Sequence, residues 1–141
     1  DWSTAPVLDI RSLIDGLIFN VLIGNADAHG KNYSLLYQNG QRRLAPFYDL
    51  VCTMAWPKVS DHLSMKIGGC NTLKEITSSH WQKMAKETGL GWPMVRERMG
   101  TFCKQVEANL EPVASALGDL DSTMIEKVVE TVRQQILRLL N

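Results

Sequence analysis

The chain has 141 residues, enough for one domain with its own core, and 45% of them are hydrophobic and 21% charged, as in ordinary globular proteins. Fifteen basic residues balance fifteen acidic ones, which argues against a dedicated nucleic-acid binder, because such proteins usually carry a basic excess. No apolar run approaches the roughly 20 residues of a membrane span, and three widely spaced cysteines (Cys52, Cys70 and Cys103) favour reduced thiols in a cytoplasmic protein.

The first predicted element is a helix over Leu8–Ile23. Its apolar residues recur every three or four positions, as on a helix with one face in the core: Ile10, Leu13, Ile14, Leu17, Ile18, Val21 and Leu22. Gly24 and Asn25 break this pattern. The segment Asp27–Asn32 is therefore predicted to be a loop directly after a buried helix.

A β-hairpin is predicted next. Strands over 33–37 and 42–44 flank Asn39 and Gly40, two residues that tolerate the positive φ angles of a tight turn. Pro46 ends the second strand, because proline cannot donate a hydrogen bond to a strand ladder. The predicted order is thus helix, polar loop and hairpin.

The rest of the chain is predicted to be mostly helical. A short strand is expected over His62–Ile67. Ser78 or Ser79 is expected to cap a helix that runs to Glu87, and Gly89 is its predicted stop.

Two longer helices follow. One begins near Pro93, which suits a first helical turn, and its apolar face comprises Val95, Met99, Phe102, Cys103 and Val106. The other begins at Ser122 or Thr123, and its apolar face comprises Ile125, Val128, Val129, Val132, Ile136 and Leu140. We expect a single α-rich unit over residues 1–141, with one small β-hairpin.

Three polar residues have the spacing found in phosphoryl-transfer enzymes. Asp27 is followed by Asn32 five residues later and by Asp49 seventeen residues after that. Protein kinases use a catalytic-loop aspartate to accept the substrate hydroxyl proton, and an asparagine and a second aspartate to bind magnesium. A lone loop aspartate more often binds nearby backbone amides. The predicted hairpin, however, brings Asn32 and Asp49 together, which favours the catalytic interpretation.

Around these residues the chain resembles the C-terminal lobe of the HipA-like kinases, serine/threonine protein kinases that act as toxins in bacterial toxin–antitoxin modules. Four segments carry the resemblance: Leu22–Asn25, Asp27–Leu35, Leu44–Leu50 and Asp61–Gly69. It extends over nearly the whole chain. It implies an α+β, predominantly α-helical fold, a protein-kinase-like C-terminal lobe whose small hairpin carries the catalytic and metal-binding loops.

The resemblance implies a role for each residue of the site. Asp27 would be the catalytic base, and Asn32 and Asp49 would hold Mg²⁺. The ATP phosphates would lie along His29, Gly30, Lys31 and Asn32. His29 has two interpretations, a hydrogen-bonded structural residue or a catalytic one. Tyr48 either contacts the nucleotide or wedges the loop with its ring.

Part of a kinase is missing from this sequence. Only 26 residues precede Asp27, with no glycine-rich phosphate loop and no strand bearing the nucleotide-binding lysine, and the chain has no initiator methionine. We therefore expect a fragment that folds alone without kinase activity.

A second hypothesis makes the helical part from Ser78 onward a protein-binding module with vestigial catalytic residues. The family's partner would be a helix-turn-helix antitoxin, with DNA reached only through it, and its substrate a protein such as an aminoacyl-tRNA synthetase. Trp56 and Pro57 are expected in the core rather than in a partner surface. Scattered lysines favour a solvated face over a nucleic-acid contact: Lys58, Lys66, Lys74, Lys83 and Lys86.

Overall fold

Helices dominate the computed structural model, which describes residues 2–118 and 121–141. The helices of this part of the chain are α1 (Pro6–Leu22), α2 (Ser78–Thr88), α3 (Trp92–Ala116) and α4 (Ser122–Leu140). Two antiparallel hairpins accompany them, β1 (Leu35–Gln38) with β2 (Gln41–Leu44), and β3 (His62–Ile67) with β4 (Cys70–Thr72). The expected mixture of many helices and little sheet is confirmed.

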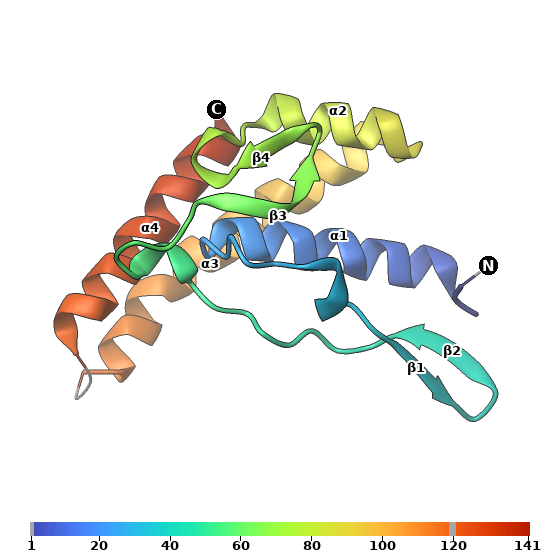
Figure 1. Ribbon diagram of the computed structural model, residues 1–141, viewed down its shortest axis with the longest axis horizontal. Coiled ribbons are helices and arrows are strands. Elements are labelled where there is room, and N and C mark those ends of the chain that lie inside the picture. The colour runs from blue at the N-terminus through green and yellow to red at the C-terminus, as the bar shows by residue number, and fades with distance from the viewer. Residues whose placement is uncertain (1, 119–120) are drawn as a thin grey trace.

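The helices pack around one apolar core. In Figure 1, α3 and α4 run beside each other, α1 crosses α3, and the β3–β4 hairpin lies next to α2. Side chains from all four helices and from β3 are buried together, among them Ile18, Leu63, Trp81, Val95 and Ile136. The predicted core faces of α1 and α3 are therefore confirmed. None of the helices in the described residues is long and apolar enough to cross a bilayer.

The starts of α1 and α2 differ from the predicted ones. α1 begins at Pro6, two residues before the predicted start, because proline fits a first turn. The prediction of Ser78 or Ser79 as the cap of α2 was wrong. Thr77 is the N-cap, and its backbone N–H donates to Nδ1 of His80, at 3.2 Å.

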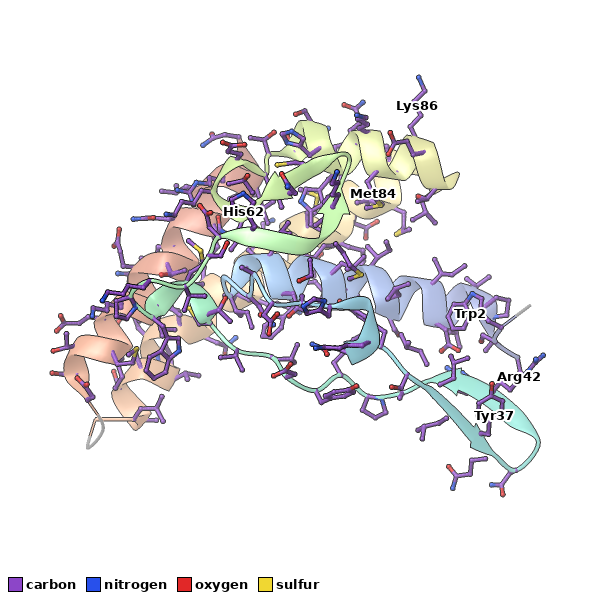
Figure 2. All side chains as sticks on the ribbon, viewed as in Figure 1. Trp2, Tyr37, Arg42, His62, Met84 and Lys86 are labelled. Carbon is purple, nitrogen blue, oxygen red and sulfur yellow. The ribbon has the colours of Figure 1, made fainter. Side chains whose placement is uncertain are left out.

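The β1–β2 hairpin projects from the helical body (Figure 1). Its turn has the predicted geometry, with φ of 50° at Asn39 and 73° at Gly40. Tyr37 and Arg42 are paired across it, and Figure 2 labels both side chains there. Its first strand begins at Leu35 rather than at residue 33. β4 and the tight turn before it were not predicted.

Two expectations about burial were wrong. Leu140 was assigned to the core face of α4, yet it is 60% exposed, and Leu139 is buried instead. Leu139 lies seven residues after Val132, so it continues the face that meets the other helices. Trp56, expected in the core, is 52% exposed, because it directly follows a single 3-10 turn whose Ala55 is buried.

A buried ion pair fixes the first hairpin to α1. The Asp9 carboxylate is 2% exposed and accepts hydrogen bonds from the Arg43 guanidinium, the Ser3 hydroxyl and the Leu44 N–H. The Arg43 and Ser3 hydrogen bonds lower the pKa of Asp9 to about 2, against the opposing effect of burial. No local pattern in the sequence indicates this pair. The ion pair fixes the position of the hairpin relative to α1.

Candidate active site

The two chain segments that flank the hairpin meet at Asn32 and Asp49. The Asn32 Nδ2 atom donates to the Asp49 Oδ2 atom at 3.0 Å. The predicted approach of these two residues is thus confirmed, although their chemical roles remain predictions. Asp49 has a φ of 59°, in the left-handed region, which is uncommon for residues other than glycine but tolerated by aspartate. Such backbone conformations persist where the surroundings hold them, and they cluster at functional sites.

Asp27 is an exposed carboxylate that lies beside His29. Its side chain is 64% exposed, and Oδ1 lies 3.0 Å from Nε2 of His29. The same Nε2 atom lies 2.9 Å from the hydroxyl of Ser64 on β3. His29 therefore connects the exposed carboxylate to a strand that is anchored in the core. This arrangement fits the structural interpretation of His29, and sequence analysis did not identify Ser64.

Asn25 makes hydrogen bonds to both of the loops that carry Asp27 and Asp49. It is 1% exposed, and its Nδ2 atom donates to Oδ1 of Asn20 at 2.7 Å and to the carbonyl of Asp49 at 3.0 Å. Its Oδ1 atom accepts from the backbone N–H of Asp27 at 3.1 Å. One buried amide thus holds the backbones of both aspartates. In the sequence, Asn25 ends the helix and belongs to the Leu22–Asn25 segment of the resemblance, but its role as a buried support of the two loops appears only in the structure.

Thr53 adds a second connection between the loops. Its hydroxyl donates to the Gly24 carbonyl at 3.2 Å and accepts from the Ala26 N–H at 2.9 Å. Gly24 has a φ of 75°, and a Cβ there would lie 2.6 Å from Thr131 and 3.3 Å from Met54. Glycine is therefore required at the turn that leads from α1 into the Asp27 loop.

The segment before Asp49 is fixed by two aromatic rings. Phe47 packs against Gly16 of α1, where an added Cβ would lie 2.5 Å from the ring. Phe47 also makes an edge-on contact with Tyr33, with 5.8 Å between the two ring centroids. The Tyr48 hydroxyl donates to the Lys31 carbonyl at 3.0 Å, and its side chain is 51% exposed. Tyr48 is thus bonded through its hydroxyl to the loop that carries Lys31, and whether its ring contacts a nucleotide or wedges the loop stays a prediction.

The chemistry of this site is that of oxygen ligands and an open face. Gly30 and Lys31 are exposed beside Asn32 and Asp49. The described residues contain no cluster of three or more His, Cys, Asp or Glu side chains that could hold a metal. A cation that uses one carboxylate and one amide needs further ligands from water or a bound phosphate, which is how proteins usually bind Mg²⁺.

The fold and these residues define the class of protein. The profile of the HipA-like C-terminal domain matches residues 2–110, and the chain belongs to this family. A relative named "Putative kinase Y4mE" from Sinorhizobium fredii is 41% identical over 97% of the chain and 34% of the relative. The serine/threonine-protein kinase toxin HipA of Shewanella oneidensis is 39% identical over 62% of the chain and 20% of its own length.

A solved structure has the same fold. The Shewanella oneidensis HipA, in complex with HipB and operator DNA, superposes with a TM-score of 0.82 at 26% identity, over 94% of this chain and 31% of that one. The chain therefore spans about a third of the length of this relative and of the first named one. The resemblance to HipA-like kinases predicted from the sequence is confirmed.

Proposed function

We propose that this chain is the C-terminal lobe of an ATP- and magnesium-dependent serine/threonine protein kinase, which acts as a toxin in a toxin–antitoxin module. The observation that carries the proposal is the meeting of Asn32 and Asp49 across the base of the hairpin, 3.0 Å apart. Asp27, five residues before Asn32, lies on the adjoining loop and has an exposed carboxylate. These are the three side-chain types that protein kinases use in this order.

The Asn32–Asp49 pair has the oxygen donors that a magnesium ion prefers. A carboxylate oxygen of Asp49 and the amide oxygen of Asn32 would hold the ion, and water or phosphate oxygens would complete its ligands. Rotation of the Asn32 amide by half a turn would present its oxygen in place of its nitrogen, and the two atoms are exchangeable by such a flip. Mg²⁺ bound there would neutralise the negative charge of the phosphates.

The remaining residues position the reactants. Asp27 would accept the proton of the substrate hydroxyl, and Lys31 would act as a point charge beside the phosphates. His29 and Gly30 would line the phosphate path, and Tyr48 would offer its open ring face to the nucleotide. Positioning and electrostatic stabilisation dominate phosphoryl transfer, so this small set of side chains suffices on this side of the site.

The isolated chain is proposed to fold but to lack activity. Nucleotide binding in kinases also needs a glycine-rich loop and a lysine that contacts the phosphates. We expect the isolated 141-residue chain to bind Mg-ATP with a Kd no tighter than about 1 mM, which corresponds to a binding free energy of about −4 kcal/mol. Calorimetric titration tests this expectation, and micromolar binding by the isolated chain would refute it.

Phosphate transfer tests the role of Asp27. The assay needs a protein in which this chain is joined to the remaining two thirds that its relatives carry. Asp27→Ala should abolish transfer, and Asp49→Asn should raise the Mg²⁺ concentration required for half-maximal rate. Asp61→Ala, at a partly exposed ion pair with Lys74 outside the site, is the matched control. Equal rates for Asp27→Ala and wild type would refute the proposed function.

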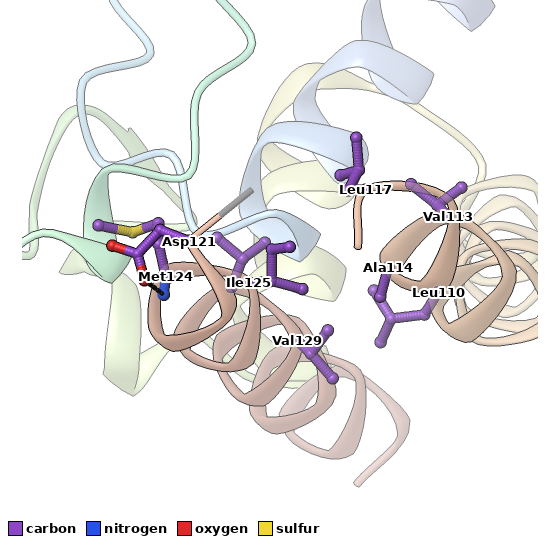
Figure 3. Close-up of a pocket in the computed structure, with 9 residues that line it drawn as sticks. Leu110, Val113, Ala114, Leu117, Asp121, Met124, Ile125 and Val129 are labelled. Atoms are coloured by element: carbon purple, nitrogen blue, oxygen red, sulfur yellow. Dashed lines mark hydrogen bonds between the residues drawn. The ribbon is translucent and has the colours of Figure 1, made fainter. Parts of the chain in front are cut away.

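An apolar groove favours a second function, docking of a protein partner on the helices. It lies between the last turns of α3 and the first turns of α4 and has a volume of about 400 Å³ (Figure 3). Its lining is almost entirely aliphatic: Leu110, Val113, Ala114, Leu117, Met124, Ile125, Val128 and Val129, with Asp121 at one end. Val113 is 56% and Leu117 42% exposed. Exposed apolar surface of this kind marks interaction sites.

The partners follow from the relatives. Because the Shewanella HipA structure is a complex with HipB and operator DNA, we propose that the complete protein binds a helix-turn-helix antitoxin and reaches DNA only through it. The substrate class is proposed to be a translation protein such as an aminoacyl-tRNA synthetase. Val113→Lys should weaken antitoxin binding without changing the rate of phosphate transfer, if the groove is the docking site. Unchanged binding would remove the groove from the interface.

A further inference from the structure

Ser64 occupies a place in the site that the motif does not explain. It lies on β3, 35 residues from His29 in sequence, yet its hydroxyl is 2.9 Å from Nε2 of His29. The same Nε2 atom is 3.0 Å from Oδ1 of Asp27. We propose that Ser64 is a positioning residue, which acts through the His29 ring to fix the carboxylate of Asp27. The inference rests on the proposed kinase function.

The three groups meet at one atom of the His29 ring. Nε2 of His29 makes a hydrogen bond with the Ser64 hydroxyl, and the ring tautomer decides which of the two is the donor. Oδ1 of Asp27 lies at ion-pair distance from the same Nε2 atom. Because His29 contacts Oδ1 of Asp27, the proposal assigns Oδ2 to the substrate hydroxyl.

β3 holds Ser64 in a fixed position beside the loop that carries His29. Leu63 and Ile67 of β3 are buried in the core, so the backbone that carries Ser64 is fixed. A Cβ on Gly30 would lie 3.5 Å from Sδ of Met65, so the strand also contacts the loop at the next residue. Without the serine hydroxyl, the His29 ring would lose its hydrogen bond to the buried strand and keep its contact with the exposed carboxylate.

Exposure separates this role from a stabilising one. The His29 side chain is 42% exposed and that of Asp27 is 64% exposed. Contacts between exposed charged or polar side chains contribute little to the free energy of unfolding. A small displacement of a catalytic group, in contrast, can reduce a rate by orders of magnitude. Removal of the Ser64 hydroxyl should therefore affect catalysis far more than stability.

The kinetic test uses the protein that carries both lobes. Ser64→Ala should lower kcat about tenfold and leave the KM for ATP unchanged, and Ser64→Thr, which keeps the hydroxyl, should restore most of the rate. Ser60→Ala is the matched control, because Ser60 makes a similar exposed contact with His62, at 3.2 Å, away from Asp27. Added to His29→Ala, the Ser64→Ala change should have no further effect on kcat, since the two residues act in series.

A spectroscopic measurement gives a readout that folding alone would not change. The Nε2 resonance of His29 in nitrogen-15 NMR should shift in Ser64→Ala and remain in place in Ser60→Ala. An unshifted resonance, a full wild-type kcat in Ser64→Ala, or no rescue by Ser64→Thr would each overturn the inference. The proposed function fails separately, if Asp27→Ala keeps the wild-type rate. Loss of activity in Asp27→Ala together with a normal Ser64→Ala refutes the positioning role alone.

Discussion

Asn25→Asp is the most informative perturbation of the scaffold beneath the site. The substitution keeps the size of the side chain and the oxygen that accepts from the Asp27 N–H. It replaces the amide nitrogen, which donates to Asn20 and to the Asp49 carbonyl, with a second oxygen. At neutral pH a buried carboxylate would then face two acceptors at 2.7 and 3.0 Å.

The magnitude follows from the two acceptors that lose their donor. A buried polar group without a partner costs about 1–3 kcal/mol, so Asn25→Asp should lower the free energy of unfolding by about 2–6 kcal/mol at pH 8. With a urea m-value of about 2 kcal/mol/M for a small protein, the midpoint should move down by about 1–3 M.

The loss should depend on pH in a known direction. Burial beside two acceptors raises the pKa of the introduced carboxyl in the folded protein above its unfolded value of about 3.9. The folded state then binds more protons than the unfolded state between these two pKa values, so stability falls as the pH rises through that window. At pH 5 the protonated carboxyl can donate again, and part of the loss should be recovered.

Urea unfolding of the isolated chain at pH 5 and pH 8 provides the assay. Asn25→Ala is the control, because it removes the same donor and introduces no titrating group. Each variant is compared with wild type at the same pH, so the titration of native groups cancels. If Asn25→Asp is destabilised equally at both pH values, or by less than about 1 kcal/mol at pH 8, Asn25 does not brace the two loops as described.

Three further predictions concern the attachment of the hairpin and one glycine of α3. Because the pKa of Asp9 is about 2 against its usual 3.8, the stability from its bond to Arg43 is complete above about pH 4 and is lost as the pH falls towards 2. Asp9→Asn should flatten that part of the curve in urea unfolding, and an unchanged curve would contradict this assignment. Gly16→Ala should cost about 1–3 kcal/mol, because its Cβ would lie 2.5 Å from Phe47. Gly100→Ala lies in the middle of α3, where an added Cβ would meet nothing within 4 Å, and should instead raise the free energy of unfolding by up to about 1 kcal/mol; urea unfolding of both glycine variants tests this.

Local patterns predicted the elements because they depend on short-range physics. The apolar spacing of α1 predicted its buried face, and Asn39-Gly40 predicted the turn that reverses the hairpin. Where the sequence was ambiguous, packing decided. Leu139 and Leu140 both fit an apolar face of α4, and only the angle at which α4 meets its neighbours buries the first and exposes the second.

The site, too, was predictable from the sequence in one part and not in another. The sequence gives the order of Asp27, Asn32 and Asp49 around a predicted hairpin. A tight turn brings the two ends of a hairpin close together, so residues at those ends lie near each other. The hairpin was enough to predict that Asn32 and Asp49 meet. In the structure, Nδ2 of Asn32 lies 3.0 Å from Oδ2 of Asp49.

The supports of the site depend on contacts between distant segments, which no local pattern encodes. Asn25 joins the two loops only because α1 ends beneath the segment that carries Asp49, and Ser64 reaches His29 only because β3 passes beside the loop. A polar residue at the end of a helix or on a strand looks the same in sequence, whether it contacts solvent or a catalytic group. The sequence alone therefore determined the elements and the order of the site residues. The tertiary structure decided which side chains hold those residues in place, because burial and long-range hydrogen bonds exist only once the chain has folded.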